Sequence, residues 1–232
     1  YSFTESFNQG TNKTDIILAV DTSCSMDDDI YNLKATFSTF VDELNTNGQD
    51  FHISAVVNDN GCVNGSVTHI DNTFSSSAAS SAFDDMIVSS TYASNAERPF
   101  MLMESFLNES VDSAGVPLSS GCNFGAVREN AKLALLGVTD EPDQSVQPYT
   151  HYVSEFQSLK SNPDNVTFHS LGGLCHNGGN TGVENAAVDT GGAIYDICTV
   201  VDAASATNFW TDFATEILTF DSNGIFELNP EA

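Results

Sequence analysis

Residues 15–26 read DIILAVDTSCSM, and this stretch decides the fold of the chain. Five consecutive apolar residues at 16–20 lie between two aspartates, which is typical of a short strand buried on both faces. A polar loop then leads into a segment, 28–44, in which apolar residues recur every three or four positions. That spacing predicts an amphipathic helix, with Gly48 as its stop signal. The sequence therefore predicts a buried strand, a polar loop and a helix that covers the strand.

The rest of the chain alternates in the same way. Further strands are expected over 51–57, 67–70, 135–140, 166–171 and 191–197. Further helices are expected over 78–89, 96–108, 128–133, 149–161 and 207–220. Because such alternation forms parallel βαβ units, the predicted fold class is α/β. We expect a doubly wound, mostly parallel central sheet with helices on both faces and one short antiparallel edge strand.

The expected domain organisation is simple, since the sequence shows no internal repeat and no clear linker. We expect a single domain over 1–220, with its core at about 14–220. The tail, 221–232, is expected to start a further domain. The polar region 58–81 is expected to be a long loop or weak edge structure.

The chain is strongly acidic, with 32 Asp and Glu against 6 Lys and Arg and a formal net charge of −26. With so little cationic surface, it is not expected to bind nucleic acid phosphates, and an anionic membrane surface would repel it. No apolar run approaches the roughly 20 residues of a membrane-spanning helix, so no direct membrane insertion is expected. The apolar fraction of 41% nevertheless indicates a folded core. Such a surface suits cations, cationic partners or a salty medium.

Polar side chains follow two of the predicted strands at the point where each strand ends. Asp21, Ser23 and Ser25 come after the first strand, and Asp140 follows the strand at 135–139. Ligands of open parallel sheets bind beyond the carboxyl ends of the strands, so these side chains are expected at one edge. Carboxylate and hydroxyl oxygens are hard ligands that suit Mg²⁺, Mn²⁺ or Ca²⁺. The sequence therefore predicts a cation site at this edge of the sheet.

Each aspartate also has a structural interpretation. Asp21 could cap the helix that follows, but the aspartates at 27–29 lie nearer to the positive end of that helix. Asp140 could be a turn residue before Pro142. Three other acidic residues near the same rim are expected to be solvated or capping carboxylates rather than ligands: Glu97, Glu141 and Asp143.

The basic residues and histidines give little support for catalysis. Arg128 is expected to form an internal salt bridge that fixes the loop before a strand. His52 and His169 lie in predicted strands and are expected to be core or edge residues rather than ligands. No H-x-x-x-H pair is present, which argues against a zinc hydrolase. The Gly-rich segment 171–182 has no phosphate-loop Lys, so nucleotide binding has little support.

The five cysteines, at 24, 62, 122, 175 and 198, include no C-x-x-C pair. This absence excludes a zinc ribbon and a thioredoxin-type motif. An odd count leaves at least one thiol unpaired within the chain. Spacing alone leaves the connectivity open, since four cysteines allow three pairings.

The segment 20–26, VDTSCSM, resembles the D-x-S-x-S motif of von Willebrand factor type A domains, in which it begins a metal-ion-dependent adhesion site. The resemblance covers about residues 14–220 and implies Mg²⁺, with Mn²⁺ or Ca²⁺ as alternatives. Asp140, in GVTD, matches the family's later Asp, and Ser94, six residues before Phe100, matches its Thr; Thr91 is the alternative. The implied ligand set is Asp21, Ser23, Ser25, Ser94 and Asp140. In such sites the serines bind directly, whereas the aspartates often act through water.

The chain also resembles the secreted and surface A-domains of Gram-negative bacteria, through FGAVRENAKLA at 124–134 and TDEPDQS at 139–145. Those domains tend to carry a late cysteine pair, which implies a Cys175–Cys198 disulfide. Cys62 and Cys122 are the favoured second pair, because both are expected near the ligand edge. Cys24 is then the free thiol, expected to be buried as a small apolar residue. The expected location is secreted, periplasmic or at the cell surface.

The implied function is metal-dependent adhesion, since a divalent cation with an open position can take a carboxylate from a partner. The expected partner is a protein or cell-surface macromolecule that presents such a carboxylate. We expect the domain to be part of a larger multidomain protein and not an enzyme. One alternative is a structural module with a degenerate metal site. Another is a metal-dependent hydrolase with Asp21 as nucleophile or base, although no His or Lys lies near the motif to complete it.

Overall fold

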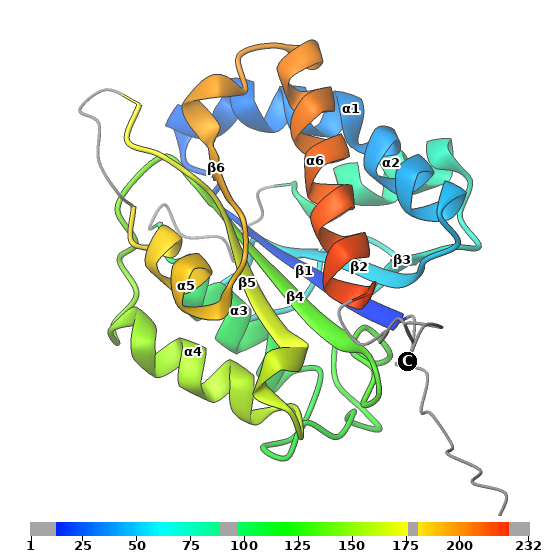
Figure 1. Ribbon diagram of the computed structural model, residues 1–232, viewed down its shortest axis with the longest axis vertical. Helices are drawn as coiled ribbons and strands as arrows, with labels where there is room; N and C mark the ends of the chain where they lie inside the picture. The colour runs from blue at the N-terminus through cyan, green and yellow to red at the C-terminus, as the bar shows by residue number, and fades with distance from the viewer. Residues whose placement is uncertain (1–12, 89–96, 176–180, 223–232) are drawn as a thin grey trace, which may run out of the picture.

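The structure, a computed structural model, describes residues 13–88, 97–175 and 181–222. Its strands form one six-stranded sheet in the order β3-β2-β1-β4-β5-β6, in which only β3 runs antiparallel to its neighbour (Figure 1). The strands are β1 (Lys13–Val20), β2 (Asp50–Val56), β3 (Ile70–Asp71), β4 (Lys132–Thr139), β5 (Val166–Gly172) and β6 (Ile194–Asp196). The helices are α1 (Asp27–Thr46), α2 (Ser76–Met86), α3 (Pro99–Asn108), α4 (Tyr149–Ser158), α5 (Val183–Thr190) and α6 (Ala203–Ser222), with short 3-10 helices η1 (Cys24–Met26), η2 (Pro163–Asn165) and η3 (Ile197–Thr199). The predicted fold class is thus confirmed.

Helices cover both faces of the sheet and enclose two apolar cores. Helices α1, α2 and α6 pack on one face, and α3, α4 and α5 pack on the other (Figure 1). The side chains of β1 alternate between the two cores, with Ile16 and Leu18 in the first and Ile17 and Ala19 in the second. This double burial explains the uninterrupted apolar run of the first strand, because neither face of β1 meets water.

An aromatic cluster holds the C-terminal helix against the first helix. Trp210 of α6 packs on Phe37 and Phe40 of α1, with ring centroids 5.3 and 5.1 Å apart. The indole Nε1 donates a hydrogen bond to the Leu33 carbonyl at 3.1 Å, so the buried ring has no unmet polar atom. These contacts fix α6 beside the helix that begins at the D-x-S-x-S loop.

Two local predictions from the sequence were wrong. The segment 128–133 is not a helix; the chain turns at 129–130 and β4 begins at Lys132. Helix α5 was not predicted, because it is only eight residues long and follows a Gly-rich segment. It ends at Gly191, whose φ of 72° is a left-handed cap conformation that glycine adopts without strain. The polar region 58–81 contains the short edge strand β3, as expected, and its last residues form the start of α2.

Both favoured disulfides are present. Cys62 is bonded to Cys122, and Cys175 is bonded to Cys198. The free thiol is Cys24, but it is exposed rather than buried. It lies in the short helix η1, where the buried apolar position is taken by Met26 instead.

Arg128 closes a buried ionic network at the amino ends of β1 and β2. Its Nε donates to Asp15 Oδ1 at 2.7 Å, its backbone N–H donates to Asp15 Oδ2 at 2.6 Å, and its Nη1 donates to Asp50. Burial raises the pKa of Asp15 to about 6, and the Arg128 charge opposes that rise. Lys160 Nζ donates to the Arg128 carbonyl at 2.8 Å, which holds the loop from the other side. The expected internal salt bridge is confirmed. It holds Arg128 in a loop, where a helix had been predicted at 128–133.

No helix within the described residues is long and apolar enough to cross a bilayer. Helix α6 extends to Ser222, two residues beyond the expected domain boundary. The rest of the tail, 223–232, lies outside the described residues, so the expectation of a further domain stays a prediction.

Arg128→Ala should lower the free energy of unfolding by about 3–5 kcal/mol, because it leaves the buried carboxylate of Asp15 without its partner. Lys34→Ala is the matched control, since Lys34 pairs with the half-exposed Asp84 and should cost roughly 0–1 kcal/mol. Urea denaturation of both variants measures the difference. Equal losses in the two variants would show that the Arg128 network is not a special source of stability.

Candidate metal centre

Strand pairing places the D-x-S-x-S loop beside Asp140. Val20, the last residue of β1, pairs in parallel register with Val138 of β4. The backbone N–H of Asp21 then donates to the Val138 carbonyl at 2.9 Å, one residue past the end of β1. Asp21 and Asp140 therefore leave adjacent strands at the same edge of the sheet, although they are distant in sequence.

A chain of hydrogen bonds joins the residues of this edge. Ser25 Oγ donates to Asp140 Oδ1 at 3.1 Å, and the hydroxyls of Ser23 and Ser25 lie 3.1 Å apart. Asp21 Oδ1 accepts the backbone N–H of Ser23 at 2.8 Å. Asp21 Oδ2 accepts the hydroxyl of Thr139 at 2.9 Å. The structure thus brings together four of the five predicted ligands around a group of oxygen atoms.

The loop itself is shaped by one short 3-10 turn. The Ser23 carbonyl accepts the Met26 N–H at 3.0 Å, and the side chain of Met26 is fully buried in the core. This anchor leaves Cys24 and Ser25 exposed on the outside of the turn. Helix α1 begins at the next residue, Asp27, so the positive end of its dipole lies beside the loop.

Several carboxylates lie close together at the site. Burial raises the pKa of Asp140; the hydrogen bond from Ser25 opposes that rise, and the charge of Asp21 adds to it. Burial also raises the pKa of Asp29, on the first turn of α1, to about 6, with contributions from Asp28 and Asp140. These carboxylates disfavour one another's ionised form, and a cation placed among them would relieve that repulsion.

Glu97 is a further carboxylate on this rim. Burial raises its pKa, and the charges of Asp21 and Glu141 add to the rise. Its side chain accepts a hydrogen bond from the amide of Gln144, and its carbonyl accepts the Gln144 backbone N–H at 2.6 Å. Glu97 therefore lies at the rim of the site with both its carboxylate and its backbone carbonyl bonded to Gln144.

Asp143 is held in the same way, since its carboxylate accepts the backbone N–H and the hydroxyl of Ser145 at 3.1 and 2.8 Å. Its backbone N–H donates to the Thr181 carbonyl at 2.7 Å. These bonds give Asp143 a local capping role, as the sequence suggested.

The donor set fits a hard divalent cation. The four residues offer carboxylate and hydroxyl oxygens, which Mg²⁺, Mn²⁺ and Ca²⁺ prefer, and the free thiol of Cys24 is a poor ligand for them. Asp21 and Asp140 are nearly buried, with 5% and 9% of their surface exposed, whereas the serines face outward. A cation held here would have protein on one side and solvent on the other.

The fifth predicted ligand, Ser94, and its alternative, Thr91, lie outside the described residues. Sequence reasoning missed two residues that the structure places at the site, Thr139 and Asp29. Thr139 orients Asp21, and its position directly before Asp140 at the end of a strand was the available signal. Asp29 was considered only as a helix-capping residue, and only the folded structure places its charge near Asp140.

Comparison with solved structures supports the fold. The chain is similar to proximal thread matrix protein 1 from the mussel byssus in two crystal structures, at 14% sequence identity in each. The matches cover 87% of this chain and 48% and 46% of the other chains, with TM-scores of 0.55 and 0.50. A third structure of that protein, with a zinc-occupied MIDAS motif, matches at 17% identity and a TM-score of 0.49.

This chain therefore spans about half the length of those proteins, and at such identity the likeness establishes the fold alone. It agrees with the von Willebrand factor A architecture that the motif implied. It does not bear on the resemblance to Gram-negative A-domains. No protein-family model matches the chain, and no curated protein sequence matches it.

The site should bind Mg²⁺ saturably in calorimetric titrations of the metal-free chain. Asp21→Ala should abolish this binding, because it removes a carboxylate and the partner of both the Ser23 N–H and Thr139. Ser25→Ala should weaken binding roughly tenfold, the effect of losing about 1.4 kcal/mol of interaction with one hydroxyl. Cys24→Ala, in the same loop, is the matched control and should bind as the wild type does. Wild-type affinity in Asp21→Ala would exclude this loop as the metal site.

Proposed function

We propose that the protein is a metal-dependent adhesion module with Asp21, Ser23, Ser25, Ser94 and Asp140 as its metal ligands. The bound cation, Mg²⁺ with Mn²⁺ or Ca²⁺ as alternatives, supplies an open coordination position that accepts a carboxylate of a protein or cell-surface macromolecule. The observation that carries the proposal is the hydrogen bond from Ser25 to Asp140, which joins two loops 115 residues apart at the edge where parallel sheets bind ligands.

The described residues are suited to different roles in such a site. Both carboxylate oxygens of Asp21 already accept a protein hydrogen bond, from Ser23 and Thr139, so Asp21 is suited to hold a bound water. The hydroxyls of Ser23 and Ser25 are exposed enough to bind directly, and they add no negative charge. Direct ligation by neutral oxygens preserves the attraction between the site and an acidic partner.

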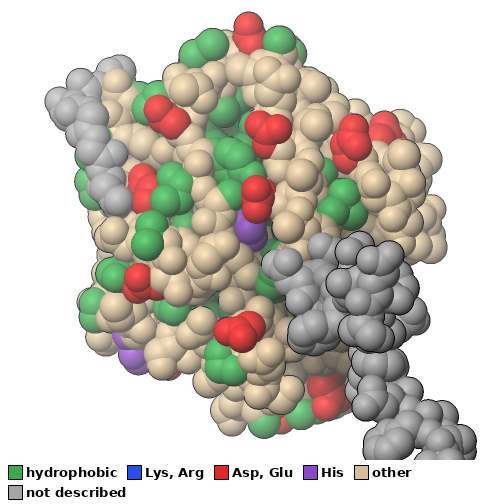
Figure 2. All heavy atoms as spheres, viewed as in Figure 1, with side chains coloured by type: hydrophobic (Ala, Val, Ile, Leu, Met, Phe, Trp, Pro, Cys, Tyr) green, Lys and Arg blue, Asp and Glu red, His purple; other side chains and the backbone are tan. Residues whose placement is uncertain are grey.

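The acidic surface works against such a partner. Figure 2 shows carboxylate side chains spread over one face of the described residues, with no cluster of Lys or Arg beside them. The carboxylates of Asp29 and Glu97 add to this field at the rim itself. Salt screens charges beyond roughly 8–10 Å, whereas direct coordination acts at contact distance. The site is therefore suited to a medium of high ionic strength.

The setting is consistent with an extracellular protein. Two disulfides are expected where the compartment is oxidising. One structural neighbour is a thread matrix protein of the mussel byssus, which fits a non-enzymatic binding role. We place this chain outside the reducing cytosol, as a secreted, periplasmic or cell-surface protein and as one module of a larger one. The resemblance of 124–134 and 139–145 to bacterial surface A-domains supports the same setting.

The alternatives differ in their requirements at the site. A hydrolase would need an acid or base beside Asp21, but among the described residues no His or Lys donates to, or accepts from, Asp21, Ser23, Ser25 or Asp140. A structural module would keep the fold and need no partner. The neighbour's name, a matrix protein, gives that second function some support.

Binding to an acidic ligand should require Mg²⁺ and should strengthen as salt rises, since screening weakens repulsion by the acidic rim. Surface plasmon resonance on immobilised Glu-containing peptides, with Gln-for-Glu peptides as the matched control, measures both effects. Chelation of the metal and Asp21→Ala should each abolish the signal. Saturable Mg²⁺ binding with no metal-dependent capture of any Glu peptide would instead favour the structural module.

A further inference from the structure

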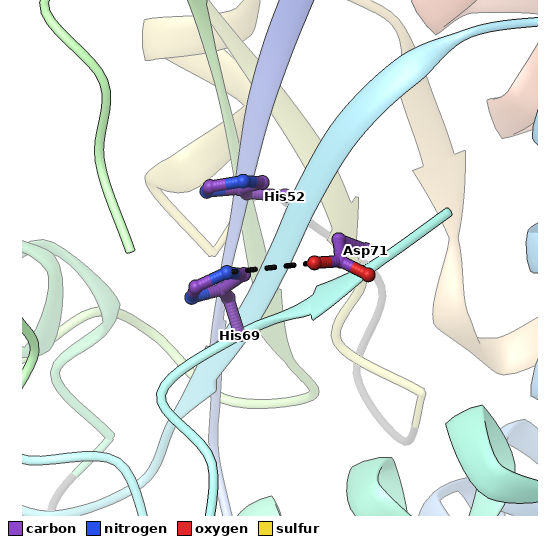
Figure 3. Close-up of side chains that lie close together, drawn as sticks. All are labelled: His52, His69 and Asp71. Atoms are coloured by element: carbon purple, nitrogen blue, oxygen red, sulfur yellow. Dashed lines mark ion pairs between the residues drawn. The ribbon is translucent and has the colours of Figure 1, made fainter. Parts of the chain in front are cut away.

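A second group of ligating side chains lies on β2 and at the edge strand β3, at the opposite end of the sheet from the D-x-S-x-S loop. His52 of β2 pairs with Asp71 of β3 in the antiparallel register, and His69 lies two residues before Asp71. As register partners, His52 and Asp71 share one face of the sheet, and Figure 3 shows the side chain of His69 beside them. One ligand atom from each lies within 4.8 Å of the others.

This cluster lies far from the proposed adhesion site. His52 also pairs in register with Asp15, which lies six residues before Asp21 on β1. At about 3.3 Å per residue, the two groups are about 20 Å apart along the strand. The edge cluster therefore shares no ligand with the proposed adhesion site.

Hydrogen bonds fix the tautomer of His52. Its Nδ1 lies 3.3 Å from the Ala126 carbonyl, and a carbonyl oxygen can only accept, so Nδ1 carries the proton. The carboxylate of Asp15 lies 4.0 Å from the same nitrogen and favours that arrangement. The lone pair of His52 is therefore on Nε2, free for a ligand.

A relay through Thr68 fixes the tautomer of His69. The Thr68 hydroxyl donates its one proton to the Phe124 carbonyl at 3.2 Å. It must then accept from His69 Nδ1, which lies 3.1 Å away, so Nδ1 again carries the proton. The Nε2 lone pair of His69 faces Asp71 Oδ2 at 3.9 Å, which is too far for a direct hydrogen bond between them.

Asp71 is oriented in the same manner. Its Oδ1 accepts the backbone N–H and the hydroxyl of Thr73 at 2.9 and 2.6 Å, which leaves Oδ2 toward the histidines. Burial raises the pKa of Asp71, but the two bonds from Thr73 and the nearby histidines together lower it below its usual value. All three groups thus present an available atom, and each is held from behind by a second hydrogen bond, as metal ligands are.

We propose that His52 Nε2, His69 Nε2 and Asp71 Oδ2 form a binding site for a transition metal ion of the Zn²⁺ class. Two imidazoles and one carboxylate suit such an ion, and they discriminate against Mg²⁺, which prefers an all-oxygen set. The three side chains are 16%, 23% and 26% exposed, so the ion can enter and a water molecule can complete its coordination. Bound there, it fastens the short strand β3 to β2.

Coordination requires one local movement. The two imidazole rings stack with centroids 3.9 Å apart and planes 16° from parallel, so their lone pairs lie side by side rather than converging. His69 is the more exposed of the two and precedes β3, so we expect its ring, rather than that of His52, to turn when the ion binds. Burial lowers the pKa of His52 to about 4 and also lowers that of His69.

A second cluster provides the control. Glu104, His151 and Glu155 also bring three ligand atoms together, on α3 and α4. This cluster has a single imidazole, which is 43% exposed, and its two carboxyl groups hydrogen-bond to each other instead of to fixed partners. It tests whether Zn²⁺ binds to any exposed acidic group that contains a histidine.

The test is a Zn²⁺ titration of the full chain in high salt and excess Mg²⁺, which occupies sites that consist only of oxygen ligands. Long-range proton–nitrogen NMR of the imidazoles is the readout. We expect both rings to be Nδ1-protonated before the metal is added, and the Nε2 signals of His52 and His69 to shift to saturation at one equivalent. The ring of His151 should not shift. The melting temperature should rise with Zn²⁺, because the ion binds only the folded state.

Variants give the second arm. His69→Gln and Asp71→Asn should each weaken Zn²⁺ binding by tenfold or more, whereas His151→Gln and Asp21→Ala should bind as the wild type does. Both altered side chains are partly exposed, so folding is expected to survive; circular dichroism checks it before titration. Shifts confined to His151, unchanged affinity in His69→Gln, or no saturable binding would each overturn the proposal. Wild-type Zn²⁺ binding in Asp21→Ala separates this result from the fate of the adhesion site.

Discussion

The parallel pairing of β1 with β4 is the constraint on which the rest of the structure depends. These central strands are buried on both faces, so they must be apolar along their length and their polar residues are displaced to the two ends. At the carboxyl end, the displaced residues are Asp21 and Asp140, which register places side by side. At the amino end, the displaced residue is Asp15, whose buried charge is met by Arg128. The pairing of β1 with β4 therefore positions both the candidate metal centre and the ionic network of Arg128.

The sequence was sufficient for the architecture and for the centre of the site because both rest on local patterns. Apolar runs and helical spacing predicted every strand and most helices of the described residues, and the D-x-S-x-S spacing located the loop. What it missed depends on contacts between distant segments. The segment 128–133 was predicted as a helix, but Asp15 holds Arg128 in a loop before β4. Cys24 was expected to be buried as a small apolar residue, whereas Met26 takes the buried position of that turn.

The cluster of His52, His69 and Asp71 also depends on contacts between distant segments, so the sequence alone did not predict it. His52 and Asp71 are nineteen residues apart, with a polar segment between them that has no strong periodicity. Their alignment follows from antiparallel register, which depends on where β3 pairs, and β3 is only two residues long. The sequence favoured a core or edge residue over a ligand for His52, since an isolated histidine in a strand carries no information about a partner. The hydrogen bonds to Ala126 and Thr68 that direct the two lone pairs come from loops that no sequence pattern places there.

The two proposed sites are chemically complementary, and this follows from the charge of the chain. A net charge of −26 concentrates every divalent cation near the surface, so selectivity cannot come from charge alone. It has to come from the donor atoms. Hydroxyl and carboxylate oxygens beside the α1 terminus favour Mg²⁺ or Ca²⁺, whereas two imidazoles at the β2–β3 edge favour a Zn²⁺-class ion. In a salty medium with Mg²⁺ or Ca²⁺ in excess, the oxygen site would bind the abundant hard ion, whereas the two imidazoles would discriminate against Mg²⁺ and bind the Zn²⁺-class ion.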